Sequence, residues 1–93
     1  MREKQIEQKL VQAVRKSGGM CLKFVSPNFD GMPDRLILFP GGKIAFVELK
    51  ATGKKPRPLQ IARHKSLMKL GFSVYVIDSV EQIGAILDEI QST

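Results

Sequence analysis

The sequence predicts an α/β fold in which a small mixed β-sheet is flanked by helices, in the order α-β-β-β-α-β-α. Two observations support this prediction. Four short apolar runs rich in Val, Ile and Phe are bounded by Gly, Pro or polar residues, as strands are. Three other segments carry apolar residues at helical spacing. A length of 93 residues fits one small domain that covers residues 1–93.

The first half of the chain is predicted to contain one helix and three strands. In the helix, over residues 3–16, Ile6, Leu10 and Val14 share one face, and two glycines follow its end. The last two strands form a hairpin around a Pro-Gly-Gly turn. The three strands are expected over residues 20–26, 34–39 and 43–50.

The second half is predicted to contain two helices separated by a strand. Pro58 suits the first turn of a helix over residues 59–70, and Gly71 ends it. The strand over residues 72–78 follows a helix, so it is expected to pair in parallel with a neighbour. A capping-box pattern, Ser-x-x-Gln, precedes the last helix, over residues 80–91.

The basic composition favours a polyanionic partner. Fifteen Lys and Arg against nine Asp and Glu give a net charge of +6, which indicates nucleic acid rather than an inert basic surface. Cys21 is the only cysteine, which excludes an intramolecular disulfide and a cysteine-based zinc site. The chain has no signal-peptide pattern and no apolar run of about 20 residues. We expect an intracellular, cytoplasmic protein without a membrane span.

One carboxylate falls within the apolar face of the first helix. On a wheel of about 100° per residue, Glu7 lies between Val14 and Val11. A carboxylate in this position is paired, bound to a metal, or at the wet edge of the face. Glu3 competes for the same role, but it lies where the helix is expected to fray, so Glu7 is preferred.

The helix over residues 59–70 shows the same anomaly. Gln60 and His64 lie in the middle of its apolar face, one turn apart. They point at one site, or they are a buried amide and imidazole satisfied by backbone groups.

The hairpin carries the most informative charges. Glu48 and Lys50 project from one face of the second hairpin strand, while Val47 and Leu49 project from the other. Both faces therefore look covered, as in a central strand, where two charges are costly unless they bind something. Asp34 belongs to the partner strand, so a second carboxylate can meet Glu48 there.

Two converging carboxylates suit Mg²⁺ or Mn²⁺, which bind through one or two carboxylates plus substrate phosphate and keep several waters. A lysine beside the ion could orient an attacking water or stabilise charge on a phosphate, as phosphodiester hydrolysis requires. A strict two-residue turn would pair Asp34 with Leu49 and point it away from Glu48. We therefore predict a longer turn or glycine bulge, or an Asp34 outside the regular pairing.

Asp34 followed by Glu48-Leu49-Lys50 resembles the signature of the PD-(D/E)XK nucleases, which share a restriction-endonuclease-like core. "PD" stands at 33–34 and "ELK" at 48–50, in the same strand–hairpin–helix order. Within this superfamily the chain is similar to a stand-alone VRR-NUC domain, the virus-type replication and repair nuclease module. The similarity lies in "GMPDRLIL", "FVELKATGKKPRPLQ" and "LGFSVYVID".

This resemblance implies a DNA endonuclease, a phosphodiester hydrolase that depends on Mg²⁺ (or Mn²⁺). It implies metal binding by Asp34, Glu48 and the Leu49 backbone carbonyl, with Glu7 as a further ligand or acting through water. Lys50 would be the catalytic lysine, and Gln60 would support the site. The resemblance also implies a homodimer that acts on branched DNA such as Holliday junctions in DNA repair. It is consistent with a virus-encoded protein that acts in a host cell.

The basic residues beside the motif fit a DNA substrate without the resemblance. Phosphate contacts position nucleic acid without reading its sequence, so selectivity for DNA structure is expected. The expected contacts are Lys54, Lys55, Arg57, Arg63 and Lys65. For a dimer, we expect exposed apolar positions on the last helix to form part of the contact, namely Ile83, Ile86, Leu87 and Ile90.

Two alternatives remain open at this point. One is a nucleic-acid-binding module without chemistry, and the other is a structural domain whose charges form a buried ion network. The Asp-Glu-Lys set argues against the first, because binding alone would favour basic residues at those positions.

Overall fold

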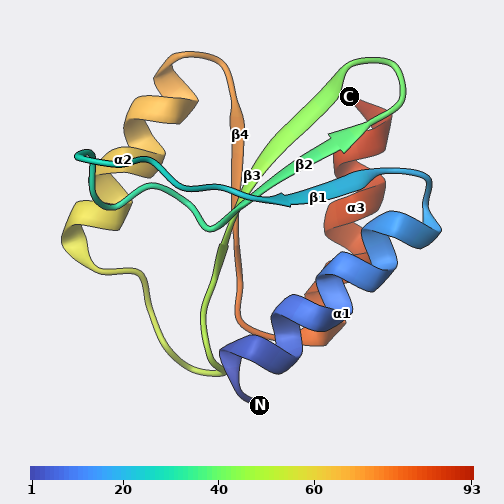
Figure 1. Ribbon diagram of the computed structural model, residues 1–93, viewed down its shortest axis with the longest axis horizontal. Helices are drawn as coiled ribbons and strands as arrows, with labels where there is room; N and C mark the ends of the chain where they lie inside the picture. Colours follow the sequence, from blue (N-terminus) through green and yellow to red (C-terminus); the bar gives the residue numbers. More distant parts are fainter.

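Four strands form one sheet of order β1-β2-β3-β4 in the computed structural model, which describes residues 1–93 (Figure 1). β1 pairs antiparallel with β2, and β2 pairs antiparallel with β3, as a hairpin should. β4 pairs in parallel with β3, as expected for a strand that follows a helix. The strands are β1 (Met20–Lys23), β2 (Arg35–Phe39), β3 (Lys43–Leu49) and β4 (Ser73–Ile77).

Three helices complete the predicted α-β-β-β-α-β-α order. α1 (Glu3–Lys16) and α3 (Ile83–Ser92) lie together on one side of the strands, and α2 (Pro58–Lys69) lies on the other (Figure 1). A single 3₁₀ turn, Val80–Gln82, precedes α3. No helix combines the length and the apolar character that crossing a membrane requires.

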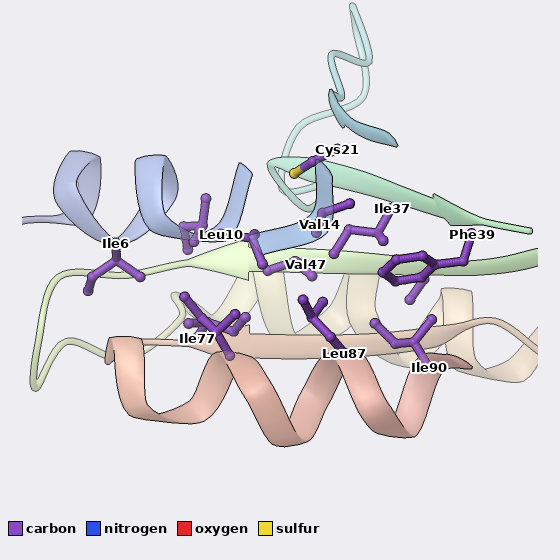
Figure 2. Packing of buried hydrophobic residues seen from close by; sticks show 13 residues of the cluster. Ile6, Leu10, Val14, Cys21, Ile37, Phe39, Val47, Ile77, Leu87 and Ile90 are labelled. Atoms are coloured by element: carbon purple, nitrogen blue, oxygen red, sulfur yellow. The ribbon is translucent and has the colours of Figure 1, made fainter. Parts of the chain in front are cut away.

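The face toward α1 and α3 holds the hydrophobic core. Figure 2 shows labelled side chains of α1 and α3 gathered over the same face of the strands. Burying an aliphatic side chain of this kind contributes roughly 1.5–3 kcal/mol, so this face supplies much of the stability. The cluster consists of Ile6, Leu10, Val14, Cys21, Ile37, Phe39, Ala45, Val47, Leu49, Ile77, Ile83, Leu87 and Ile90.

The apolar stripe of α3 is part of this core. Ile83, Leu87 and Ile90 are at most 5% exposed, and Ile86 packs against the same cluster. The expectation that these residues are exposed and form a dimer contact is therefore wrong. A ten-residue helix with apolar side chains on one face needs the sheet to cover that face.

β1 is shorter than predicted and ends at Lys23. The N–H of Phe24 still donates to the carbonyl of Asp34 at 2.8 Å, but the ladder stops there. Pro27 has no N–H to continue it, and Asn28 adopts a φ of 63°, which turns the chain away from the sheet. The residues that follow form the loop that leads into the site.

Candidate active site

The hairpin register places Asp34 beside Glu48. Phe39 pairs with Lys43, so three residues make the turn, and both of its glycines have a φ between 74° and 84°. The first pair of the β2–β3 ladder is Arg35 with Val47. One residue beyond it, the same register sets Asp34 opposite Glu48. The prediction that the turn is longer than two residues is confirmed. The two carboxylates therefore share one face at the end of the hairpin.

Asp34 is held by the backbone of β3. Its N–H donates to the carbonyl of Val47 at 3.1 Å, and its Oδ2 accepts a hydrogen bond from the N–H of Leu49 at 2.8 Å. The ring of the fully buried Pro33 fixes the backbone just before it. These contacts fix the carboxylate at the end of the strand.

Glu48 is 1% exposed, and Gln60 holds its carboxylate. Nε2 of Gln60 donates to Oε2 of Glu48 at 3.0 Å, while Oε1 of Gln60 accepts from the N–H of Arg57 at 2.8 Å. Arg57 immediately precedes α2, so Gln60 is the capping-box residue of that helix. Because both ends of its amide are used, Gln60 joins the first turn of α2 to the end of β3.

His64 contacts the other oxygen of the same carboxylate. Its Nε2 lies 3.3 Å from Oε1 of Glu48, and its side chain is buried. Burial and the charge of Lys50 lower the pKa of His64, which favours the neutral imidazole. The expectation that Gln60 and His64 point at one site is confirmed, and that site is Glu48.

Lys50 lies on the same face as Glu48, two residues along the chain. Its Nζ is 3.7 Å from Oε2 of Glu48, and its side chain is 15% exposed. Its backbone N–H donates to the carbonyl of Ile77 in β4 at 3.0 Å, which extends the parallel pairing past Leu49. The ammonium group is therefore only partly hydrated and acts strongly on charges near it.

The electrostatics of the site are dominated by Glu48. Its burial, together with the negative charge of Asp34, raises the pKa of Glu48 to about 8, and Lys50 only partly opposes this. Two carboxylates that repel each other in a buried place are the donor set that a divalent cation would neutralise. A strongly raised pKa of this origin is also typical of functional sites.

Two relatives with known descriptions match almost the whole chain, although no family model matches it. The sequence is 54% identical over 79 residues to "Putative nuclease p44" of Acyrthosiphon pisum secondary endosymbiont phage 1, with 85% of each chain covered. A solved structure described as "VRR_NUC domain" matches with a TM-score of 0.86 and 30% identity, over 92% of this chain and 94% of that one. The chain belongs to the VRR-NUC family.

Two glutamates of α1 differ in their surroundings within this VRR-NUC fold. Oε2 of Glu7 accepts from Nε of Arg35 at 3.0 Å, so the carboxylate preferred from the sequence is neutralised by an ion pair. Glu3 is exposed, but loss of hydration and the charge of Asp34 raise the pKa of its carboxyl group, and Lys50 opposes this. Of the two glutamates, Glu3 is thus the one whose pKa is raised by the charge of Asp34.

The first turn of α1, where Glu3 was expected to fray, is joined to other groups by two hydrogen bonds. The N–H of Thr52 donates to the carbonyl of Met1 at 3.1 Å, and the N–H of Arg2 donates to Oε1 of Gln5 at 2.9 Å. The first turn of α1 is therefore fastened to the loop that follows Lys50.

The donor set fits a hard divalent cation such as Mg²⁺. Asp34 and Glu48 supply two carboxylates, and no group of three or more His, Cys, Asp or Glu residues is close enough to hold a metal. Mg²⁺ keeps several waters and is usually bound through one or two carboxylates plus substrate phosphate, so two are enough. Glu48 and Asp34 would hold the ion, and the carbonyl of Leu49 stays a predicted ligand.

The residues expected to contact DNA fall into two groups. Lys54, Lys55, Arg57 and Lys65 are exposed, and none of them forms an ion pair. Arg63 is engaged within the protein, because its Nε donates to the carbonyl of Asp30 at 2.8 Å and its guanidinium lies 3.8 Å from the centre of the Phe29 ring. It fastens the loop before Asp34 to α2.

Arg35 is the residue near the site that sequence reasoning missed. It follows Asp34 and points to the opposite face of the sheet, where it pairs with Glu7 and donates from its Nη1 to the carbonyl of Cys21 at 3.1 Å. The sequence could have predicted this pair. Alternation along a strand sends Asp34 and Arg35 to opposite faces, and a carboxylate in the apolar face of α1, Glu7, needed a partner on the face of Arg35.

Proposed function

We propose that this chain is a metal-dependent endonuclease that hydrolyses phosphodiester bonds in DNA, with preference for branched DNA such as Holliday junctions. The observation that supports this best is the position of Asp34, Glu48 and Lys50 together at the end of the central strand β3. A module that only bound DNA would have no use for a buried carboxylate whose pKa is raised to about 8.

The reaction would form a bond from a water oxygen to phosphorus and break the bond from phosphorus to the leaving oxygen, while the water loses one proton and the leaving oxygen gains one. When bound, Mg²⁺ or Mn²⁺ would polarise the phosphate and lower the pKa of the attacking water. Lys50 would place its ammonium against a phosphate oxygen or the attacking water and stabilise the charge that develops. Gln60 and His64 would keep Glu48 in place, so that Lys50 keeps its position relative to the substrate.

We also propose that Glu3 rather than Glu7 is the carboxylate of α1 that acts in the site. Its pKa responds to Asp34 and Lys50, whereas the carboxylate of Glu7 is neutralised by Arg35. Glu3 would accept hydrogen bonds from water bound at the metal.

The exposed basic residues of the loop after Lys50 would bind DNA phosphates. Lys54, Lys55 and Arg57 carry no internal ion pair, so their charges are available to a ligand. Each phosphate contact contributes roughly 0.9 to the slope of log affinity against log salt. Replacing all three by Ala should weaken binding to every DNA sequence alike and flatten this slope by about 2–3. An unchanged slope would remove this loop from the interface.

A homodimer is proposed because a four-way junction needs two cuts and one chain offers one site. The face of the sheet toward α2 exposes a row of apolar side chains, one from each strand or its edge, that a second copy would cover. Met20 is 56% exposed, and Ile44 and Phe72 are each 36% exposed. The register aligns them with Leu38, and the row lies at the hairpin end, away from Glu48.

The dimer is tested by the mass in solution, measured by light scattering at micromolar concentration. Ile44→Ser should shift the wild-type dimer toward the 10.4 kDa monomer, whereas Ile61→Ser, a comparably exposed apolar residue on α2, should not. A wild-type protein that is entirely monomeric would refute the dimer.

The proposed activity is tested on a panel of end-labelled DNA: single strand, linear duplex, flap, and four-way junction. Each is incubated with Mg²⁺, with Mn²⁺ and with EDTA. We expect cleavage only with a divalent cation, and fastest for the four-way junction. Binding without cleavage under every condition would favour the module without chemistry, and cleavage in EDTA would refute the metal dependence.

A further inference from the structure

A polar cleft of about 530 Å³ runs along α1, on the face of the sheet to which Arg35 points. Six residues of one face of α1 and a single strand residue line it, and only one of the seven is apolar. In Figure 1, α1 runs to the right from the bottom of the view, whereas the loop from β3 to α2 runs to the left. The lining residues are Lys4, Glu7, Gln8, Val11, Gln12, Arg15 and Arg35.

The charges of this cleft favour an anion. Lys4, Arg15 and Arg35 are cationic, and the single carboxylate, Glu7, is already neutralised by Arg35. Arg35 uses its Nε and one N–H of Nη1 within the protein, which leaves further N–H groups of its guanidinium available. The amides of Gln8 and Gln12 add donors along the same wall. Lysine, arginine and amide donors in a row are the groups that contact phosphates in protein–DNA complexes.

The cleft is a track rather than a point site, because its lining residues follow α1 over almost its whole length. From Lys4 to Arg15 the helix rises by about 16 Å, which is roughly the axial length of five nucleotides of one strand. Lys4 follows Glu3 in the chain, and Arg35 follows Asp34. Because Arg35 points to the face of the sheet opposite Asp34, a phosphate chain in the cleft would lie on that opposite face, next to the segments that carry Glu3 and Asp34.

We infer that this cleft binds the phosphodiester backbone of a second segment of the substrate, while the loop with Lys54, Lys55 and Arg57 binds the segment on the other side of the catalytic residues. The inference rests on the proposed function and extends it. Two separate cationic surfaces, one on each side of the cutting site, suit DNA whose arms diverge at the scissile phosphate.

The same helix supplies a matched control. Lys9 and Lys16 are exposed on α1 but do not line the cleft. Replacing Lys4 and Arg15 by Ala removes two positive charges from the helix, and so does replacing Lys9 and Lys16 by Ala. Only the first pair removes charge from the cleft, so a general electrostatic effect of α1 would appear equally in both double variants.

The test measures the affinity for an end-labelled four-way junction by fluorescence anisotropy in EDTA, where no cutting is expected. Lys4→Ala/Arg15→Ala should lose about tenfold in affinity and lower the slope of log affinity against log salt by about 2. Lys9→Ala/Lys16→Ala should stay within about twofold of wild type. Equal losses in the two double variants, or no loss in the first, would overturn the inference.

A crosslinking experiment locates the DNA directly. Gln12→Cys should form a disulfide with a four-way junction that carries a tethered thiol near the cutting point, and Lys9→Cys should not. Equal crosslinking at both positions would contradict the cleft as the track. If wild type cuts DNA while the cleft variants bind normally, only this inference fails. If wild type neither binds nor cuts any DNA, the proposed function fails as well.

Discussion

The two faces of the β-sheet are covered in different ways. Toward α1 and α3, thirteen buried apolar or small side chains form one cluster without a buried polar group. Toward α2, the helix buries only Leu67 besides Gln60 and His64, and these two hold Glu48. All three buried polar residues of the chain thus lie on this second face, where Gln60 and His64 both contact Glu48.

The two faces therefore have different roles: the first stabilises the fold, and the second carries the proposed catalytic residues. An apolar face gains free energy with each buried side chain, whereas a buried carboxylate costs free energy unless a partner neutralises it. Edge-to-face contacts of Phe46 with Phe24 and Phe72, at ring distances of 5.5 and 5.7 Å, stabilise the second face beside the polar cluster. Substitutions on the two faces should therefore have opposite signatures, loss of fold on one and loss of activity on the other.

The largest effect is expected from the carboxylates. Glu48→Gln and Asp34→Asn should lower the rate of DNA cleavage by about 10³-fold or more, because each removes a charge that the metal and the transition state need. The thermal midpoint of unfolding should not fall, since Glu48→Gln replaces a buried carboxyl group, whose pKa is raised to about 8, by an uncharged amide of similar shape. Glu81→Gln, a surface change, is the control. A carboxylate variant that unfolds without losing specific activity would break the distinction between the faces.

The opposite signature is expected from Leu10→Ala in α1. It leaves a cavity in the cluster and should lower the free energy of unfolding by about 2–5 kcal/mol. Denaturant titration measures this loss. Cleavage per folded molecule, measured well below the midpoint, should stay within about twofold of wild type. Lost cleavage with unchanged stability would show that α1 acts in chemistry through its buried face.

An intermediate effect is expected where α1 reaches the site. Glu3→Gln should lower the cleavage rate by about 10–100-fold, because it removes a carboxylate that acts on water at the metal. Glu7→Gln should have a smaller effect on the rate but should destabilise the fold, because it leaves Arg35 without its partner. Single-turnover rates and melting curves of both variants separate the two roles. The reverse order of rates would restore Glu7 to the position preferred from the sequence.

The smallest expected effect is a dependence of stability on pH, caused by Glu48 on the face toward α2. The folded protein keeps the proton of Glu48 up to a pH of about 8, whereas the unfolded chain releases it near the ordinary pKa of a glutamate. Without metal, stability should therefore fall as pH rises from about 5 to 8, by up to about 1.4 kcal/mol per pH unit.

Melting curves of wild type and Glu48→Gln at several pH values measure this difference. The curve of the variant should be flatter, and added Mg²⁺ should restore wild-type stability near pH 8, because the ion binds the ionised carboxylate. Parallel curves for the two proteins would contradict the raised pKa.

The sequence predicted the parts of the site that follow from a short-range period. Alternation along β3 predicted that Glu48 and Lys50 share one face of that strand. Helical spacing predicted that Gln60 and His64 share one face of α2. The hairpin register followed from requiring that two carboxylates meet. These inferences needed only neighbours along one element or across one turn.

Features that depend on distant packing were missed. The hydrogen bond between Met1 and Thr52, which joins the first turn of α1 to the loop after Lys50, links residues that no periodicity relates. The burial of Ile83 and Leu87 depends on α3 crossing the same face as α1, which the order of elements alone does not give. The pairing of Glu7 with Arg35 likewise depends on how α1 lies over the sheet.

The central claim, that the polar cluster at the end of β3 is a catalytic centre, is tested most directly by Lys50→Ala. Its single-turnover cleavage of a labelled four-way junction in Mg²⁺ is compared with that of wild type and Lys69→Ala, an exposed lysine at the end of α2. The account predicts no detectable cleavage by Lys50→Ala, with the junction still bound and the thermal midpoint retained, and near-normal cleavage by Lys69→Ala. Cleavage by Lys50→Ala at the wild-type rate would contradict it.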